Sequence, residues 1–574
     1  MRDDAPDHRI RSGRPARPDA PGWDGASAAD SLPPPPPPPY RSSAGADTRP
    51  RRETADRPSR TVEGRPGLRK IGISELVLIT SMTHAPLVML WGIMPTTYQF
   101  SGVVATPLVF GIGGFALVVF SIAFGGLSRR IRHSGGLYAF VTAGLGPTIG
   151  LGGAVLAISS YSLLLGGVLV LLAGVLTTFV DGVFGIHIAL QVSVVLAVAA
   201  VVALGRLQAR TLARVYLVLA ASQVIAVLWI DYGAVTTPEG GQISFDAIDP
   251  TWLLGGSFSL ALCFALTSFV GSETGATYAD EVIEPRRTVP RATIISYAIA
   301  AIVLLVSGWA ISVATGPENA VSITQGSYES QTGGNGQPLV LVVVERLVAP
   351  EHVLTLVHLL TGALVLGALG ASTSIHHSVA RQVASLARDG VLPPALAVRR
   401  NGGTPVHAAW FAVVIAGPMA LIAVSVDNTS VALVGGILGG LGIIAVLALT
   451  SLAAIVYFLR GAEEDDTGFL GWEGNLVAAT FALVVTGFVF VYALIRLPTV
   501  LADVAPAVSW MFPLALGGTF AAGVVWALVL RATRPGALAT IGRSEPAGQP
   551  ARSDPPSRPN RPDVVISEHA DRPV

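Results

Sequence analysis

The sequence predicts an all-α integral membrane protein with about twelve transmembrane helices, and its composition is the first reason. Of the 574 residues, 51% are hydrophobic and only 13% are charged, whereas a soluble chain carries about 25% charged residues. The mean hydropathy is +0.61. The 63 glycines are spread through apolar runs, as is common in membrane helices. An ordinary soluble fold is therefore excluded.

Segment length is the second reason, because a spanning helix needs about 20 apolar residues. The stretch 136–180 is too short for two helices and a loop, so we expect one long tilted helix that runs into a re-entrant or surface piece. The predicted spans are 74–96, 104–127, 136–170, 188–204, 211–231, 253–279, 293–314, 353–377, 407–425, 431–458, 475–496 and 509–531.

Two polar tails flank the apolar core. Residues 1–69 and 536–574 are rich in Arg, Pro, Asp and Ser, and such segments bury too little apolar surface to offset the entropy of ordering. We therefore expect both to be disordered. We divide the apolar part into a core of helices 1–10 at 70–460 and a pair of additional helices, 11 and 12, at 461–535.

Arginine distribution predicts the orientation. One set of alternate loops is rich in arginine, for example at Arg129, Arg286 and Arg399, whereas the opposite loops hold only Arg346 and Arg496. Since basic loops stay in the cytoplasm, we expect both termini there and a multi-pass protein of the inner (cytoplasmic) membrane. A net charge of zero indicates no nucleic-acid partner, and the single cysteine, Cys263, excludes a cysteine metal cluster or an intrachain disulfide.

Two of the predicted helices carry signals for a break inside the membrane. In the first, Ser81, Thr83 and His84 directly precede Pro86, which removes a helical hydrogen bond. In the sixth, Gly271 and Gly275 flank Ser272, Glu273 and Thr274. Backbone interrupted in hydrocarbon must line a cavity or be covered by protein. Alternatively, the proline only kinks the first helix and the glycines only permit close packing.

Breaks in the first and sixth spans are typical of a five-plus-five inverted repeat, in which the two broken helices face each other at the bilayer midplane. Exposed amides there favour a substrate carboxylate, and exposed carbonyls favour an ammonium group or a cation. The pattern therefore predicts a site for a small zwitterion or amine. The residues that we expect to line it are Ser81, Thr83, His84, Ala85, Thr267, Ser268, Phe269, Gly271, Ser272 and Glu273.

The sequence resembles the amino acid–polyamine–organocation superfamily, in particular bacterial amino acid permeases. Four stretches carry this resemblance: SGGLYAFVTAGLG from Ser134, FVGSETGATYADEVIEPRRTVPRA from Phe269, RQVASLARDGVLPPAL from Arg381 and GGTPVHA from Gly402. The resemblance covers nearly the whole apolar core and neither tail. It implies twelve spans, alternating access and secondary transport of amino acids or related amines, by proton symport or by exchange.

Three side chains could titrate within the spans. Glu273 is the strongest candidate, because a carboxyl in a dry cavity is costly unless it is paired or protonated, which suits a proton carrier or a pH-sensitive gate. It could equally pair with a substrate ammonium or cap exposed amides of the broken helix. His84 and His376 could relay protons, although a membrane histidine is more often a hydrogen-bonded packing residue.

The resemblance also suggests gating and coupling positions. Phe269 aligns with an aromatic that shuts the site in relatives, and Gln223 lies where some relatives place an ionisable residue, but it cannot titrate. Ser372 lies in a stretch whose hydroxyls complete a sodium site in some members. Without a carboxylate in helix 1 we expect protons rather than sodium. Asp389, paired with Arg381 or Arg388, is expected to latch the inner gate.

A secondary active transporter is the function that this pattern favours, either coupled to protons or exchanging one substrate for another. A passive facilitator or channel is less favoured, because no filter-like repeat is present. An enzyme is disfavoured because the spans hold no metal set and no nucleophile–base spacing. We expect no cofactor and no metal, with the lipid bilayer as surroundings. The oligomeric state leaves no signature, since lipid-facing and partner-facing apolar surfaces look alike in sequence.

Overall fold

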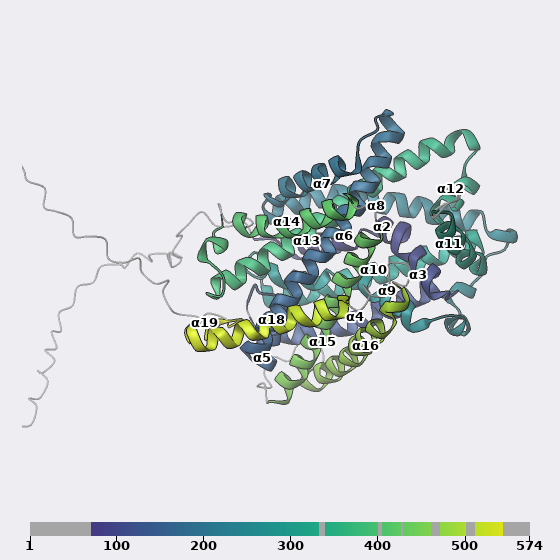
Figure 1. Ribbon diagram of the computed structural model, residues 1–574. Helices are drawn as coiled ribbons and strands as arrows, with labels where there is room; N and C mark the ends of the chain where they lie inside the picture. Colours follow the sequence, from purple (N-terminus) through teal and green to yellow (C-terminus); the bar gives the residue numbers. More distant parts are fainter. Residues whose placement is uncertain are drawn as a thin grey trace, which may run out of the picture. The chain divides into compact units, whose positions relative to one another are not determined.

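The protein is helical throughout the part that the computed structural model describes, which is residues 70–131, 133–331, 339–399, 405–425, 429–460, 471–500 and 511–543 (Figure 1). Of the expected tails at 1–69 and 536–574, all but residues 536–543 lie outside the described residues. The long helices are α4 (Thr106–Arg130), α6 (Pro147–Phe184), α8 (Ala209–Thr236), α10 (Pro285–Thr315), α13 (Pro350–Arg388), α14 (Val406–Ser425), α15 (Thr429–Leu459), α16 (Gly471–Val500) and α18 (Met511–Thr533).

Two further helical stretches are interrupted. The first comprises α1 (Ile73–Ser81), η1 (Met82–His84), α2 (Pro86–Val88), η2 (Met89–Ile93) and α3 (Met94–Ser101). The second comprises α9 (Phe258–Ser268) and the 3₁₀-helix η6 (Ser272–Tyr278). The shorter helices are α5 (Leu137–Leu145), α7 (Leu190–Gly205), α11 (Pro317–Gln331), α12 (Leu339–Leu347) and α19 (Pro535–Thr540), with 3₁₀ turns at Glu239–Gly241, Asp246–Ile248, Pro250–Leu254 and Pro394–Ala397.

Among the described residues, eleven helices are long and apolar enough to cross a membrane. The one predicted segment without a counterpart among these eleven is the fourth in the chain, 188–204. It is the helix α7, which has 16 residues. At 1.5 Å per residue this helix is about 24 Å long, which is less than the hydrocarbon thickness of about 30 Å. The structure therefore supports a polytopic helical membrane protein, and α7 alone separates the observed count from the expected one.

Residues 136–180 form two helices where one long helix was predicted. Gly146 has φ +88°, and Pro147 begins a new helix directly after it, so α5 and α6 are separate helices. The helix α6 then continues for 38 residues to Phe184, with no re-entrant piece. Pro147 occupies the first helical turn, where a missing N–H costs no helical hydrogen bond. The apolar run 148–180 thus remains one helix.

The C-terminal tail also begins later than expected. Instead of disordered chain from 536, the helix α19 follows α18 directly (Figure 1), and the described chain continues to Arg543. Leu538 and Ile541 are buried. These two side chains provide apolar burial that the composition of the segment did not lead us to expect.

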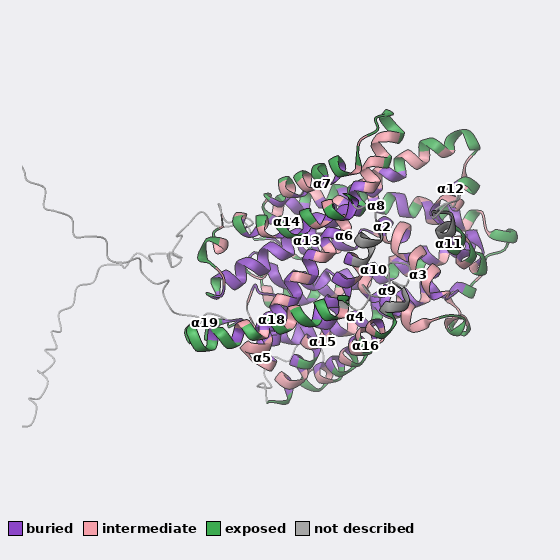
Figure 2. Cartoon of the chain, viewed as in Figure 1, coloured by how far each residue is buried: buried purple, intermediate pink, exposed green. Residues whose placement is uncertain are grey.

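Among the long uninterrupted helices, α4 and α15 are the most buried, whereas exposed residues are frequent on α7 and α18 (Figure 2). Glycines let some interior helices touch backbone to backbone. A Cβ placed on Gly439 of α15 would lie 2.6 Å from the carbonyl oxygen of Ser160 and 2.6 Å from the amide nitrogen of Leu164, both on α6. Such approach is the usual packing mode of membrane helices.

We expect Gly439→Ala to lower the free energy of unfolding by about 1–3 kcal/mol, because backbone atoms cannot yield to the added methyl group. Gly436→Ala on the same helix is the matched control, since a Cβ there has no neighbour within 4 Å. Thermal unfolding of both variants in one detergent checks the prediction. Equal melting temperatures would show that α6 and α15 separate at no cost.

Candidate functional site

The predicted break in the first helix is present. Regular helix ends at Ser81, a 3₁₀ turn covers Met82–His84, and Ala85 has the non-helical angles φ 16° and ψ 87°. Helix resumes at Pro86, a position that suits proline because the first turn of a helix needs no N–H partner. Five residues, Met89–Ile93, then form a π-helical turn. The side chains of Thr83 and His84 are buried.

The break predicted in the sixth helix is also present, between α9 and η6. The helix α9 ends at Ser268, and Gly271 takes φ +134° before η6 begins, a conformation that residues other than glycine rarely adopt. Ser272, Glu273 and Thr274 follow, all buried. The two glycines predicted to flank the break have different roles: Gly271 makes the turn, whereas Gly275 lies within η6.

The two breaks touch each other. A Cβ on Gly271 would lie 2.3 Å from Oγ1 of Thr83, so only glycine permits this approach. His84 Nε2 lies 2.8 Å from the carbonyl oxygen of Phe269, a carbonyl freed by the end of α9. The His84 and Phe269 rings also pack against each other, with centroids 6.3 Å apart. The sequence separation of about 185 residues shows that the fold brings the two interrupted segments together.

Glu273 lies at this junction and accepts hydrogen bonds from three groups. Tyr161 of α6 donates to Oε1, and Tyr297 of α10 donates to Oε2 over 2.5 Å. The backbone N–H of Gly271 lies 3.0 and 2.9 Å from the two oxygens. Both carboxyl oxygens of Glu273 are thus hydrogen-bonded, each to one phenol and to the Gly271 amide. Glu273 therefore ties the second break to α6 and α10.

Several hydroxyls at the junction have no hydrogen-bond partner among the described residues. They are Oγ of Ser81, Oγ of Ser272 and Oγ of Ser372. Buried polar atoms are nearly always satisfied, so each exception calls for an explanation. Hydroxyls that bind a polar ligand would provide one. The structure thus leaves donors and acceptors at both breaks for a small polar molecule.

Other predicted lining residues use their hydroxyls locally. Thr267 and Ser268 both donate to the carbonyl of Phe264, at 2.8 and 2.7 Å, as Ser and Thr in membrane helices often do. Thr83 donates to the carbonyl of Thr80 over 2.5 Å. These three hydroxyls would have to rotate before they could contact a ligand.

The helix α13 packs against the first break. Ser374 donates to the carbonyl of Ile79 over 3.0 Å, and a Cβ on Gly370 would lie 2.7 Å from Cγ of Met82. Gln223 is a packing residue here: its amide nitrogen donates to the carbonyl of Ala363 over 2.6 Å. A Cβ on Gly367 would lie 2.5 Å from its Oε1. Gln223 therefore joins α8 to α13.

His376 lies apart from the junction. It is buried, neither ring nitrogen has a hydrogen-bond partner among the described residues, and Gly205 of α7 packs directly on its ring. No described hydrogen bond links it to Glu273. We also find no group of three or more His, Cys, Asp or Glu side chains in the described ranges that could hold a metal ion.

A cluster of charged side chains lies beyond the second break. Arg381 of α13 is fully buried and donates to both oxygens of Glu281, at 3.2 and 3.1 Å. Its guanidinium carbon lies 3.8 Å from the ring centroid of Tyr278, and its Nη1 lies 2.7 Å from Nδ1 of His377. Because guanidinium has no acceptor, Nδ1 of His377 must accept this bond. Arg381 thus joins α13 to the end of the second broken stretch.

A second ion pair lies beside the first. Arg388 Nη1 lies 2.7 Å from Oδ2 of Asp280, and Arg399 lies 3.5 Å from the same oxygen. Partial burial alone would raise the pKa of the Asp280 carboxyl. The hydrogen bond and charge of Arg388, with the charge of Arg399, outweigh burial and hold this pKa below its ordinary value. Asp280 therefore stays ionised and paired near neutral pH.

The predicted partner of Asp389 is wrong. Asp389 was expected to pair with Arg381 or Arg388, but those arginines pair with Glu281 and Asp280. Asp389 instead accepts from His133 Nε2 and from the hydroxyl of Tyr138, both at 2.9 Å. Asp389 follows the last helical residue, so its carboxylate points toward the segment before α5 rather than back along α13. We use the name polar gate for two ion pairs, Arg381 with Glu281 and Arg388 with Asp280.

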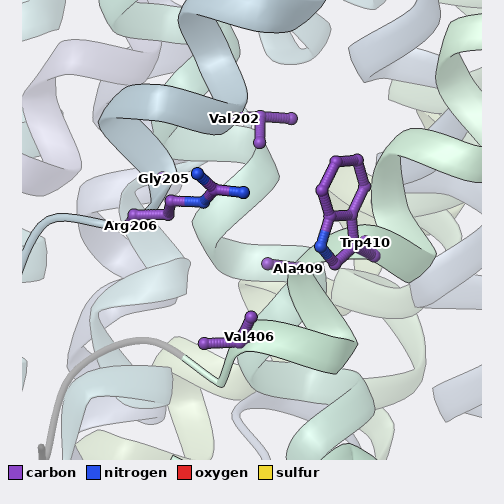
Figure 3. Close-up of a pocket in the computed structure, with 6 residues that line it drawn as sticks. All are labelled: Val202, Gly205, Arg206, Val406, Ala409 and Trp410. Carbon is purple, nitrogen blue, oxygen red and sulfur yellow. The ribbon is translucent and has the colours of Figure 1, made fainter. Parts of the chain in front are cut away.

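A shallow groove elsewhere is unrelated to this junction. Figure 3 shows it between α7 and α14, lined by Val202, Gly205, Arg206, Val406, Ala409 and Trp410. The Arg206 guanidinium lies 5.9 Å from the Trp410 ring centroid. None of these residues belongs to either broken helix, so the groove has no role in the site.

Two tyrosines of the site were missed in the sequence. Tyr161 lies in the middle of a long apolar helix and Tyr297 in the next span after the break. A buried tyrosine hydroxyl usually finds a hydrogen-bond partner. A single tyrosine within an apolar span therefore indicates a polar partner on another helix, and this was the sequence pattern that could have identified both residues. Neither residue borders a proline or glycine break, which is the pattern on which the prediction relied.

These features define an integral membrane protein whose two interrupted helices meet at a buried polar site. A family model described as "Amino acid permease" matches residues 76–520, and the chain belongs to this family, within the amino acid–polyamine–organocation superfamily. Membership implies a membrane transporter of amino acids, and permeases of this kind are generally not enzymes. A comparison with curated proteins gave no match.

Proposed function

We propose that this permease is a secondary active transporter that moves a small amino acid or related amine across the cytoplasmic membrane by alternating access, driven by protons. The observation that carries the proposal is the contact between the two helix breaks: Glu273 lies in the second break, and the hydroxyls of Ser81, at the first, and Ser272, at the second, have no hydrogen-bond partner among the described residues. Small hydroxyls leave room for a compact substrate, and exposed backbone groups can bind its carboxylate and ammonium groups.

The five-plus-five inverted repeat remains part of this proposal. With α7 counted, the broken stretch Phe258–Tyr278 is the sixth membrane helix, and Ile73–Ser101 is the first. Both breaks carry a non-helical residue followed by a new helical start. We also propose that 70–460 forms the transport core, that 461–535 adds two helices, and that both termini lie in the cytoplasm, as the arginine distribution indicates.

Alternating access needs the substrate to be closed off from at least one side at a time. The polar gate supports this requirement, because it holds the end of η6 to α13 through buried and half-buried ion pairs. Phe269, fully buried between the His84 and Phe110 rings, covers the junction. A passive channel would need a continuous polar path, so this arrangement favours a transporter.

Protons are favoured over sodium as the coupling ion by two contacts. Glu273 is a carboxylate that can exchange a proton when the phenol hydrogen bonds rearrange. The carbonyl of Ile79, by contrast, already accepts from Ser374, so one of the two lone pairs that a sodium ion could use there is occupied. Exchange of one substrate for another is the alternative transport mechanism, since it requires the same opening and closing of the binding site but no coupling ion.

Uptake into proteoliposomes tests the proposal. We expect an inward proton gradient to raise uptake of labelled amino acids at least about tenfold over the no-gradient level, and an inward sodium gradient to have no effect. Stimulation only by excess unlabelled substrate inside would establish an exchanger. Uptake that neither saturates nor shows counterflow would contradict a transporter and favour a facilitator.

A further inference from the structure

The C-terminal segment 535–543 docks onto the same end of the molecule as the polar gate. The hydroxyl of Thr540 lies 2.7 Å from the backbone carbonyl of Asp389 and 2.8 Å from that of Ala537 in its own helix, so its one proton is shared between the two carbonyls. The backbone N–H of Gly542 donates to Oδ2 of Asp389 over 2.9 Å. Leu538 and Ile541 are buried beside these contacts. The segment is therefore anchored by both polar and apolar contacts.

Gly542 fits a position that other residues would disturb. Its φ is +63°, and a Cβ there would lie 3.0 Å from Cα of Ala139 and 3.0 Å from Cβ of Thr142, both on α5. A left-handed glycine at a close approach is a feature of specific docking. The segment thus bridges α5 and the residue that ends α13.

Asp389 is the centre of this docking. Its carboxylate accepts from Gly542, from Tyr138 and from His133. Nδ1 of His133 accepts the backbone N–H of Gly135 over 3.0 Å, so Nε2 carries the ring hydrogen that Asp389 receives. Three donors from separate parts of the chain therefore fix one carboxylate.

The neighbouring residue, Arg388, belongs to the polar gate. Its Nη1 pairs with Asp280 at 2.7 Å, and its Nη2 donates to Ser134, next to His133. Fixing the backbone of Asp389 through Thr540 and Gly542 therefore also fixes the point from which Arg388 reaches the second broken helix. We therefore expect loss of these contacts to give Arg388 more freedom and to weaken its ion pair with Asp280.

We propose that the C-terminal segment 535–543 helps to keep the polar gate closed. By holding Asp389, it stabilises the arrangement in which η6 packs against α13. This inference rests on the proposed alternating access, in which the gate opens and closes during each cycle. We expect release of the segment to shift the population toward the open arrangement, because the contacts that hold Asp389 in the present arrangement are then lost.

Thiol labelling measures this shift without any substrate. Cys263 is the only cysteine, so Cys263→Ala gives a background without thiols. Thr277→Cys then places a reporter at a side chain that is 2% exposed and packs beside Gly136, behind the gate. A membrane-impermeant maleimide applied to inside-out vesicles reaches this thiol only when the gate opens. Right-side-out vesicles check that labelling comes from the cytoplasmic side.

We expect Thr540→Val to raise the labelling rate about fivefold, the effect of losing one hydrogen bond. A chain ending at Arg534 should label at least as fast. Thr533→Val is the matched control, since its hydroxyl bonds only within α18, to Val529, and it should label at the parental rate. A chain ending at Arg543 keeps the docked segment and should also match the parent.

Parental labelling rates in both Thr540→Val and the chain ending at Arg534 would overturn the gate role. If the chain ending at Arg534 does not insert, Thr540→Val alone decides the question. The labelling result is independent of transport. A protein that shows the expected labelling pattern but no uptake would therefore contradict the proposed function and leave the role of the C-terminal segment intact.

Discussion

Glu273→Gln is expected to abolish accumulation driven by a proton gradient while the protein remains folded and inserted. A glutamine amide has nearly the same shape as the carboxylate but cannot take up and release a proton at physiological pH. Its oxygen can still accept from Tyr161 and Gly271, and the Tyr297 hydroxyl can turn to accept from its amide nitrogen. Uptake under an inward proton gradient should fall at least about tenfold, to the no-gradient level.

Counterflow separates the two roles that Glu273 could have. A proton carrier is needed only for coupling, so we expect the Glu273→Gln protein to keep exchanging external labelled substrate for internal unlabelled substrate. Tyr297→Phe is the companion variant: it removes one hydrogen-bond partner of Glu273 but keeps the carboxyl group, and it should retain proton-driven accumulation. If Glu273→Gln accumulates substrate like the parent, Glu273 has no coupling role. If the folded variant loses counterflow, Glu273 instead holds the helix break in the arrangement that exchange requires.

The breaks and the long apolar spans could be predicted because their causes are local in sequence. Pro86 lacks an N–H, and Gly271 can adopt a positive φ, whatever surrounds them. Apolar runs of sufficient length specify membrane helices in the same way. The Gly146 break was missed because it is a boundary within continuous apolar sequence, where composition changes little.

The partners of charged groups could not be predicted, since they depend on which helix ends meet in space. Asp389 is adjacent to Arg388 in sequence, yet Arg388 reaches Asp280, 108 residues away, and Asp389 reaches His133 and Gly542. The same limit concealed Tyr161, which meets Glu273 across 112 residues. Residue types in the site were predictable, whereas the pairing among them required the fold.

The ion pair between Glu281 and Arg381 leads to the prediction with the largest expected effect on stability. We expect Glu281→Leu to lower the free energy of unfolding by about 3–5 kcal/mol, because it leaves a fully buried guanidinium without its carboxylate. His377 and Tyr278 remain as neighbours, but neither carries the opposing charge. Thermal and denaturant unfolding in one lipid–detergent mixture measures the loss.

The double variant Glu281→Leu with Arg381→Met decides whether the loss comes from an unpaired charge. Apolar side chains of similar volume can replace a buried ion pair at little cost, so most of the stability should return. Asp280→Asn is the matched control on the adjacent pair. Its partner Arg388 is 37% exposed, and exposed pairs contribute about 0–1 kcal/mol. A double variant as unstable as Glu281→Leu would instead mean that Glu281 stabilises the protein through contacts other than Arg381, with Arg399 at 3.7 Å the next candidate.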